Sequence, residues 1–257
     1  MILSLTIIIQ FKIRVVCLML FMEMSSMKFD LHSHSSYSYD GYTTYNEYLN
    51  YDGNIDVLAI TDHNNFDFHY RYQKSNDGKA YRVGKLIIIP GEEIMTCDAG
   101  EIVGLFLKES ISSGLTLKNT ILQIKSQGGI VYIPHPFDLY RRKSRPNIKA
   151  VKKFINEVDI IEIENGKYLT RFESLIARRF ATSNKKMCGA GSDAHKISEV
   201  GQVFLEMKYN EEVITKDDLI KLLEHKYSVH TKKKSIILRV IKKLKKMVNN
   251  GTNSNFK

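Results

Sequence analysis

Residues 28 to 35 read Lys28-Phe29-Asp30-Leu31-His32-Ser33-His34-Ser35. The first half of this stretch, residues 28–31, has the short β-rich pattern of a strand. Alternate side chains of an extended segment point to the same side, so His32 and His34 can converge on one metal ion. Taken alone, the pair could equally be two surface histidines at a strand end. The stretch therefore predicts a strand that ends in two candidate ligands.

Similar β-rich segments recur along the chain and alternate with segments of helical periodicity. Strands are expected at residues 28–31, 57–61, 86–90, 101–107, 130–133, 158–163, 187–190 and 203–207. Helices are expected at residues 44–51, 117–126, 148–157, 170–184 and 216–226, and no Pro/Gly/Ser-rich linker interrupts the series. This order is typical of parallel strands joined by crossover helices, so the sequence predicts one α/β domain.

The composition agrees with such a domain and excludes some other classes. The chain has 257 residues, of which 43% are hydrophobic and 26% are charged, as in ordinary globular proteins. Its three cysteines, Cys17, Cys97 and Cys188, have no C-x-x-C spacing and cannot all pair with one another. We therefore expect neither a disulfide framework nor a zinc ribbon, and we expect a reducing, cytoplasmic location.

The two ends of the chain differ from the domain, which we place at residues 27–230. Residues 1–26 are apolar, but Gln10, Lys12 and Arg14 interrupt them, and the uninterrupted run at residues 15–22 is too short to span a bilayer. The net charge of +10 comes from residues after Glu224, where no acidic residue occurs. Residues 231–257 predict a basic amphipathic tail that touches nucleic acid or an anionic membrane surface, or that docks by its apolar face.

Four more groups of histidine or carboxylate residues follow expected strands. They are Thr61-Asp62-His63, Gly91-Glu92-Glu93, Pro134-His135-Pro136 and Ser192-Asp193-Ala194-His195, and Asp40 lies in the loop after the first strand. In barrels of strands and helices, the catalytic groups come from the C-terminal ends of the strands. Each group alone is weak evidence, but five groups at five strand ends predict one metal site built from distant segments.

Local sequence indicates how some of these groups are oriented. Glu92 and Glu93 are adjacent, so only one of them enters the site if the backbone stays extended. Pro134 and Pro136 fix the backbone on both sides of a histidine and end its strand. Glycines near Asp193 allow the backbone to approach a crowded site closely.

In combination, the motifs resemble the polymerase and histidinol phosphatase (PHP) family of metal-dependent phosphoesterases. The resemblance runs from about Lys28 to about Val203 and rests on D-L-H-S-H-S, T-D-H, G-E-E, P-H-P and G-S-D-A-H in the family's order. It implies a distorted (β/α)7 barrel, similar to a TIM barrel, with two or three divalent ions of zinc, manganese or iron. By this resemblance His32, His34, Glu93 and Asp193 hold one ion, Asp40, His63 and His195 hold a second, and His135 joins Glu93 at a third.

One position departs from the family pattern. Many relatives have a histidine at the start of the strand after the glutamate motif, whereas this chain has Glu101. A carboxylate binds the same kinds of ion and favours manganese or iron over zinc. Glu101 therefore either keeps the third site with altered affinity or leaves it empty.

The predicted function is hydrolysis of a phosphate ester by metal-activated hydroxide. Paired ions acidify a water and clamp the phosphoryl oxygens. His63 or His195, if it is not fully committed as a metal ligand, is the candidate proton donor to the leaving group. The resemblance favours a phosphorylated small molecule, a nucleotide or an oligonucleotide as substrate, and thus a phosphatase or an exonuclease-like enzyme.

A basic loop after the P-H-P motif offers candidate substrate contacts. Guanidinium groups bind phosphate in a bidentate manner, so Arg141, Arg142 and Arg145 are candidate clamps, although a solvated basic loop has the same sequence. Two other functions remain open: a binding or regulatory module without catalysis, and an amide or lactone hydrolase with the same metal chemistry. Retention of all five motifs argues against the first, and the arginines argue against the second.

Overall fold

The computed structural model describes residues 26–141, 143–208 and 215–232. These residues contain one sheet of ten strands. The strands are β1 (Ser26–Ser33), β2 (Val57–His63), β3 (Tyr81–Val83), β4 (Leu86–Thr96), β5 (Gly100–Leu105), β6 (Ile130–Ile133), β7 (Ile160–Asn165), β8 (Met187–Gly191), β9 (Val203–Lys208) and β10 (Tyr227–Thr231). The two terminal segments predicted from the sequence, an apolar extension and a basic tail, lie almost wholly outside the described residues, so the domain boundaries stay a prediction.

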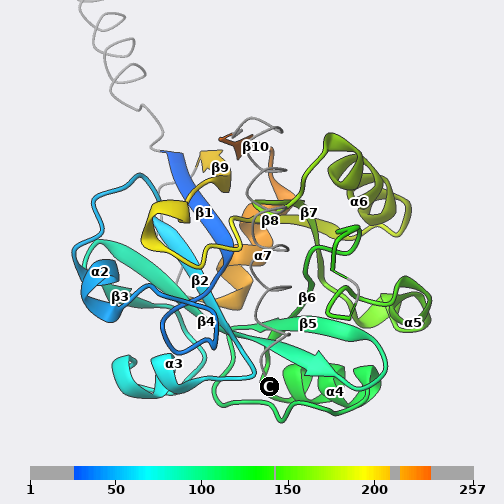
Figure 1. Cartoon of the computed structure of the whole chain (residues 1–257), viewed down its shortest axis with the longest axis horizontal. Coiled ribbons are helices and arrows are strands. Elements are labelled where there is room, and N and C mark those ends of the chain that lie inside the picture. The colour runs from blue at the N-terminus through cyan, green and yellow to red at the C-terminus, as the bar shows by residue number, and fades with distance from the viewer. Residues whose placement is uncertain (1–25, 142, 209–214, 233–257) are drawn as a thin grey trace, which may run out of the picture.

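Helices surround the sheet (Figure 1). They are α2 (Tyr45–Leu49), α3 (Asp67–Tyr72), α4 (Leu117–Ser126), α5 (Ile148–Lys153), α6 (Arg171–Ser183) and α7 (Lys216–Glu224), with 3-10 turns at Ile155–Glu157 and Ile197–Glu199. Threonines cap the N-termini of four of them, and three of these threonines, Thr44, Thr170 and Thr215, each form a capping box with an acidic residue three positions later. Among the described residues, no helix is both long enough and apolar enough to cross a membrane.

The strands form a nearly closed, barrel-like sheet in the order β10-β9-β1-β2-β4-β5-β6-β7-β8, with β3 paired beside β4. The end of β8 returns to β1: Ser33 and Ala194 form a parallel bridge, and the Asp193 amide donates to the His32 carbonyl over 2.8 Å. Gly191 permits this approach, because a Cβ atom there would lie 2.3 Å from the Cβ of His32. The closure brings the first and last sequence motifs together.

The α/β class and the barrel-like sheet agree with the sequence prediction, but the sheet departs from strict β/α alternation. Strand β4 runs to Thr96 instead of ending at Pro90, and three residues separate it from β5. So short a connection cannot make a crossover, so β5 pairs antiparallel with β4. Strand β9 is likewise antiparallel to β1. Glu92 and Glu93 therefore lie within a strand and not after it.

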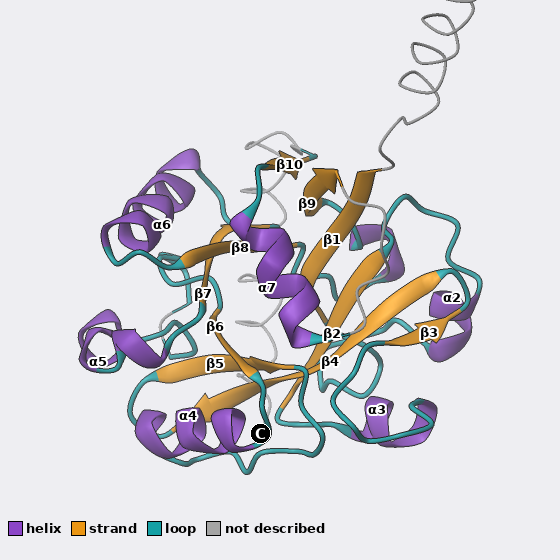
Figure 2. Cartoon of the chain, turned by 180° about the vertical axis from the view of Figure 1, so that it is seen from behind, coloured by secondary structure: helices purple, strands orange, loops and turns teal. Residues whose placement is uncertain are grey.

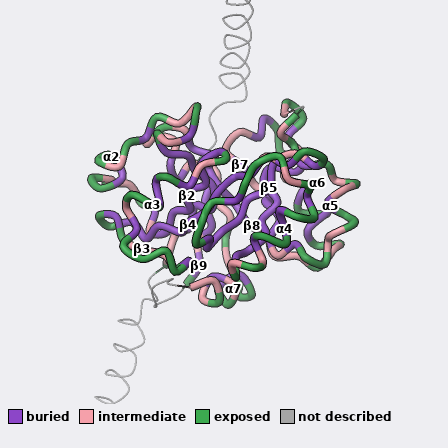
Figure 3. Tube along the Cα trace, turned by 90° about the horizontal axis from the view of Figure 1, so that it is seen from below, coloured by how far each residue is buried: buried purple, intermediate pink, exposed green. Residues whose placement is uncertain are grey.

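The core has an inner part and an outer part. Side chains of the strands that fill the barrel include Phe29, Val57 and Ile89, and leucines of α7, such as Leu219, pack against the same cluster. Figure 2 shows α7 crossing the barrel on this side. Outside the barrel, α4, α5 and α6 pack on the strands, and the buried trace in Figure 3 marks the strands as the centre of the molecule. The strand ends are therefore held rigidly by packing on both faces.

All the expected strands and helices have counterparts, and three elements were not expected. Helix α4 and strand β6 occur at the predicted bounds. The unexpected elements are α3, β3 and β10. Helix α3 and strand β3 are too short for their residue patterns to be recognised, and β10 is paired only along one edge, with β9.

Candidate metal centre

Strand β1 delivers two histidines to the mouth of the barrel. His32 and His34 are fully buried, and their ring centroids lie 5.2 Å apart. The His34 amide donates to the Ala194 carbonyl over 2.8 Å, which fixes the end of the strand. The alternation predicted from the sequence thus places both imidazoles on the same side.

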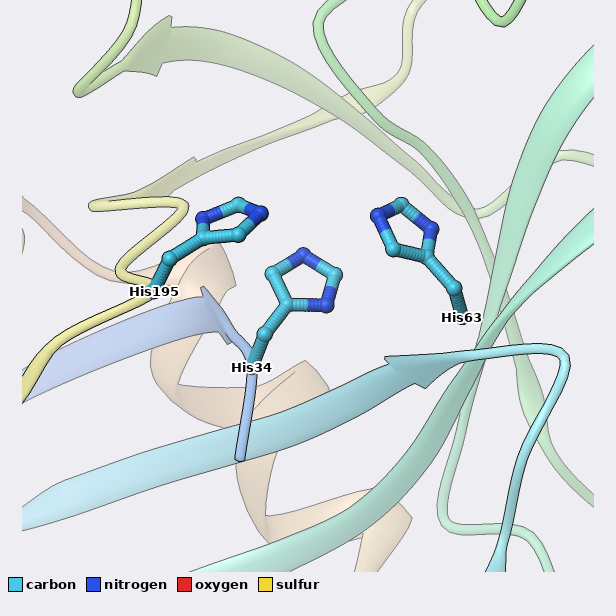
Figure 4. A group of neighbouring side chains, drawn as sticks. All are labelled: His34, His63 and His195. Carbon is cyan, nitrogen blue, oxygen red and sulfur yellow. The ribbon is translucent and has the colours of Figure 1, made fainter. Parts of the chain in front are cut away.

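Two further histidines face His34 from other strand ends (Figure 4). His63 is the last residue of β2, and His195 lies in the loop after β8. The His34 ring centroid lies 4.4 Å from that of His63 and 4.5 Å from that of His195. Nitrogen atoms of the three residues all lie within 4.8 Å of one another, which is the spacing of a site for one cation.

Glu93 lies at the centre of the cluster. Its carboxylate oxygens are 3.4 Å from His32 Nε2, 3.4 Å from His34 Nε2, 3.2 Å from His63 Nδ1 and 2.9 Å from His135 Nε2. This carboxylate is fully buried. Glu93 would therefore hold cations together with these imidazoles, and the cations would supply Lewis-acid chemistry there.

Glu101 enters the same pocket from the start of β5. Its oxygens lie 3.4 Å from His63 Nδ1 and 3.7 Å from His135 Nε2. Together with Glu93 and His63 it forms a group whose ligand atoms lie within 4.8 Å of one another. The position that departs from the family pattern is thus still directed at the site.

Asp193 and Asp40 complete the set of predicted ligands. An Asp193 oxygen lies 3.5 Å from His34 Nε2, and another group of suitable spacing joins Asp193 to His32 and His135. Asp40 is more exposed and lies 3.1 Å from His195 Nε2 and 3.7 Å from His63 Nε2. The structure thus brings all nine predicted ligands together. The groups of ligands that lie within 4.8 Å of one another differ from the groups that the family resemblance assigns to each ion.

The donor set fits divalent cations. Imidazoles and carboxylates together suit zinc, manganese and iron. Several buried ligand atoms have no hydrogen-bond partner among the described residues, and a buried polar atom without a partner costs about 1–3 kcal/mol. These atoms are His34 Nε2, Asp40 Oδ1, Glu101 Oε2, His135 Nδ1 and Asp193 Oδ1. Coordination of cations would satisfy such atoms.

The electrostatics of the pocket indicate the same need for positive charge. Burial and the nearby charge of Glu93 raise the pKa of Glu101 to about 9. Burial disfavours the charged form of Glu93 too, but His32 and His63 hold its pKa well below the usual range. Burial also lowers the pKa of His34 to about 3, so this imidazole is neutral and ready to coordinate.

Two of the ligands have strained backbone. His135 has a φ of 29° and Asp193 a φ of 52°, which is unusual for residues other than glycine. The His135 amide donates to Glu162 over 2.6 Å, and the Asp193 amide donates to the His32 carbonyl over 2.8 Å. These bonds hold the two residues in conformations that direct their side chains into the site.

Two acidic residues that support the site were not assigned roles from the sequence. Glu162 lies 3.2 Å from His32 Nδ1 and accepts from the Tyr132 hydroxyl over 2.9 Å, so it orients an imidazole from behind. Asp30 accepts from the amides of Ser192 (2.8 Å) and Gly201 (2.9 Å). The signal in the sequence was an acidic residue between two apolar residues of a strand, Asp30 between Phe29 and Leu31 and Glu162 between Ile161 and Ile163.

The structure separates the two adjacent glutamates as alternation predicts. Glu92 faces away from the histidines, where it accepts from Ser110 Oγ (2.9 Å) and from the Ile111 amide (2.8 Å). It is also fully buried. Asp62 also takes a supporting position, since it accepts from the Ser35 amide over 2.6 Å beside His34.

The arginine loop contributes one side chain to the site. The Arg141 guanidinium pairs with Asp193, with Asp138 (3.4 Å) and with Glu101 (3.7 Å). Arg145 is exposed and donates to the Asp138 carbonyl over 3.3 Å, at the edge of the loop. Arg142 lies outside the described residues.

Comparison with known proteins agrees with this geometry. Residues 174–226, which include Asp193 and His195, match the family described as PHP-associated. In this segment the chain is similar to the PHP-associated family, in agreement with the motifs that resemble the PHP family. Two uncharacterized proteins of Methanocaldococcus jannaschii are 38% and 40% identical to the chain over 159 and 110 residues, which are 59% and 43% of this chain. The matches span 66% and 57% of those relatives, so part of each relative has no counterpart in the match.

Solved structures share the PHP fold at low sequence identity. A two-domain protein from Bacteroides vulgatus that contains a predicted PHP-like metal-dependent phosphoesterase has a TM-score of 0.58 at 16% identity, covering 80% of this chain and 65% of that one. PsfC from Pseudomonas syringae has a TM-score of 0.60 at 17% identity, covering 87% and 99%. The endonuclease PfuEndoQ from Pyrococcus furiosus has a TM-score of 0.55 at 13% identity, covering 80% and 58%. Together they establish the barrel-like fold.

Proposed function

We propose that this PHP-family chain hydrolyses phosphate esters with two or three divalent cations, of zinc, manganese or iron, bound at the mouth of the barrel. The observation that carries the proposal is the convergence of nine ligand side chains from distant segments of the chain on one pocket, around the buried Glu93. Bound cations would acidify a water molecule and stabilise charge on the phosphoryl oxygens.

Arg141 is the candidate phosphate contact in this site. Its guanidinium lies among Asp193, Glu101 and Asp138, and it is only 19% exposed. When those carboxylates serve as ligands their charge is shared with cations, and the guanidinium can then pair with an anionic phosphoryl group. Arg145 is exposed and donates to the Asp138 carbonyl instead of pairing with a predicted ligand, so we propose Arg141 ahead of it, and we keep Arg142 only as a prediction.

His195 is the better candidate for protonating the leaving group. Its side chain is 17% exposed, whereas that of His63 is 3% exposed, so a leaving group that departs from the site toward solvent passes closer to an accessible His195. Its Nδ1 lies 2.9 Å from the Asp193 carbonyl, which leaves Nε2 directed toward Asp40 and the mouth. An imidazole at this edge can exchange its proton with water between turnovers.

The proposed substrate is a phosphomonoester or a nucleotide-containing phosphodiester. One of the solved structures with this fold, Endonuclease Q, is a complex with a 27-mer duplex substrate, which supports nucleic acid as one substrate class to test. We also propose a cytoplasmic location, for which the only support is that the spacing of the three cysteines does not indicate disulfide bonds. Contact of the basic tail with nucleic acid or an anionic membrane stays a prediction.

The decisive experiment combines elemental analysis with a substrate screen. We expect the purified chain to carry at least two equivalents of zinc, manganese or iron and to release phosphate or nucleotides from phosphomonoesters or short oligonucleotides. The proposal would be overturned if the metal-loaded protein cleaved amides or lactones but no phosphate ester. Metal-free, inactive protein that still binds phosphate esters would instead indicate a binding module.

The role of Arg141 can be tested with a matched pair of variants. Arg141→Gln removes the guanidinium within the site, and Arg145→Gln removes one from the same loop at its edge. A charged hydrogen bond contributes about 1.5–3 kcal/mol, so we expect KM to rise by about 10-fold or more only for Arg141→Gln. An equal change in both variants would argue against the clamp.

A further inference from the structure

Tyr39 lies at the mouth of the metal centre in an unusual position for a large aromatic side chain. Its ring stacks on that of His63, with centroids 4.9 Å apart and an interplanar angle of 25°. The residue is nevertheless 81% exposed, more than any other large hydrophobic residue among those described. Since one face of the ring lies against His63, the exposed area is the opposite face and the edges.

The fold does not account for this exposed ring. Folding drives large aromatic side chains to bury area, and Tyr39 buries little beyond its contact with one ligand histidine. Its hydroxyl contributes no hydrogen bond to the loop, and the loop is held instead by backbone bonds such as Gly41 to Ser38 (3.1 Å) and Tyr42 to His195 (2.9 Å). The ring is thus positioned by the loop but left free on one face.

Two further exposed aromatic residues belong to loops that contribute residues to the site. Tyr42, 67% exposed, stands beside the ammonium of Lys196 at 5.3 Å. Tyr140, 55% exposed, is adjacent to Arg141 on the loop from the other side of the barrel. Exposed aromatic rings interleaved with basic groups are typical of surfaces that bind nucleotides.

We propose that the open face of Tyr39 stacks on the base of a nucleotide whose phosphate is bound at the metal centre. This inference rests on the proposed function and names its substrate class: a phosphorylated nucleoside, free or at the end of an oligonucleotide. A base bound there would extend the stack of Tyr39 on His63 by one ring. Every base has a π-face that can stack on a tyrosine ring. A sugar phosphate or an alkyl phosphate has no flat group to occupy the same place.

Binding, and not turnover, gives the sharpest test. The probes are phosphonate analogues of adenosine 5′-phosphate, of the dinucleotide pApA and of ribose 5-phosphate, in which a methylene group replaces the ester oxygen and prevents hydrolysis. Calorimetric titration of the manganese-loaded, full-length chain measures each dissociation constant. The variants are Tyr39→Ala, which removes the ring, Tyr39→Phe, which keeps it, and Phe172→Ala, which removes an exposed aromatic side chain from α6.

We expect the adenosine analogue to bind about 5- to 150-fold more tightly than the ribose analogue, because stacking of one base on an aromatic ring contributes about 1–3 kcal/mol. That ratio should persist in Tyr39→Phe and Phe172→Ala and fall towards one in Tyr39→Ala. Tighter binding of the pApA analogue than of the adenosine analogue would identify an oligonucleotide end, and equal binding would identify a mononucleotide. A ratio of one in the wild type, or a ratio unchanged in Tyr39→Ala, would overturn the inference.

The same proteins separate this inference from the proposed function. Phosphate release is measured in parallel from adenosine 5′-phosphate, pApA and ribose 5-phosphate. A base-dependent binding ratio without any hydrolysis would support the role of Tyr39 and refute the hydrolase. Hydrolysis of ribose 5-phosphate as fast as of the nucleotides, with no binding ratio, would support the hydrolase and refute the role of Tyr39.

Discussion

Glu92 and Glu93 form a natural matched pair for testing the metal centre. Both are fully buried glutamates on β4, one residue apart, and they face opposite sides of the sheet. Glutamine has nearly the shape of glutamate but carries no charge and coordinates cations weakly. We therefore compare Glu93→Gln with Glu92→Gln, and we expect only the first to lose metal.

The expected magnitude follows from the contacts of Glu93. Its carboxylate lies within 3.4 Å of four imidazoles and belongs to two of the groups with ligand spacing. Loss of a residue that only orients a ligand weakens metal binding about 10- to 100-fold. Loss of a carboxylate that itself coordinates should cost at least about 100-fold in metal affinity, or about 2.7 kcal/mol. Glu93→Gln should thus lose at least one equivalent of metal.

Glu92→Gln should keep its metal, because its contacts allow the exchange. The glutamine oxygen can accept from the Ile111 amide, and its amide group can donate to the Ser110 hydroxyl. Elemental analysis after dialysis against a weak chelator measures the metal in both variants, and circular dichroism checks that both are folded. Equal metal content in the two variants, or loss confined to Glu92→Gln, would refute the assignment of Glu93.

Three further predictions concern stability and catalysis. Burial raises the pKa of Glu92 from 4.5 to about 7, so the folded state favours its protonated form, and the free energy of unfolding falls as pH rises from 4.5 to 7. Glu92→Gln has no such carboxyl group, so its free energy of unfolding, measured with urea, should not show this fall, which amounts to about 3 kcal/mol at pH 7 and above. Asp30→Asn should leave one of two buried amides unpaired and lower the free energy of unfolding by about 1–3 kcal/mol, whereas an unchanged urea midpoint would contradict the closure we describe. His195→Gln should lower kcat more for alkyl phosphates than for p-nitrophenyl phosphate, whose leaving group needs no proton; equal losses would remove the proton-donor role.

The sequence predicted most of the fold because its elements have strong local signals. Helix α4 has apolar positions on one face and two glycines after it, and its bounds were predicted correctly. Strand β4 was predicted too short, because its inward carboxylate at Glu93 and its Gly91 interrupt the apolar run that marks a strand. The sheet pairs through backbone groups, so it continues where the side chains change character.

The candidate site was predicted more completely than the residues that support it. His32 and His34 stand out in the sequence because histidine pairs at a strand end are uncommon, and the motifs around them are specific in combination. Glu162 and Asp30 did not stand out, because a single acidic residue in a strand has many explanations. Their roles depend on partners 130 and 162 positions away along the chain, the His32 ring and the Ser192 amide.

The sequence by itself determined which residues are candidates to carry the chemistry, since only certain side chains coordinate cations and alternation along a strand sets the face to which each one points. Tertiary structure alone decided which of them meet, how Arg141 enters among the carboxylates, and that Tyr39 stacks on His63 with one face open. The physical reason is that closure of β8 onto β1 sets distances between segments far apart in the chain, and no local pattern encodes those distances.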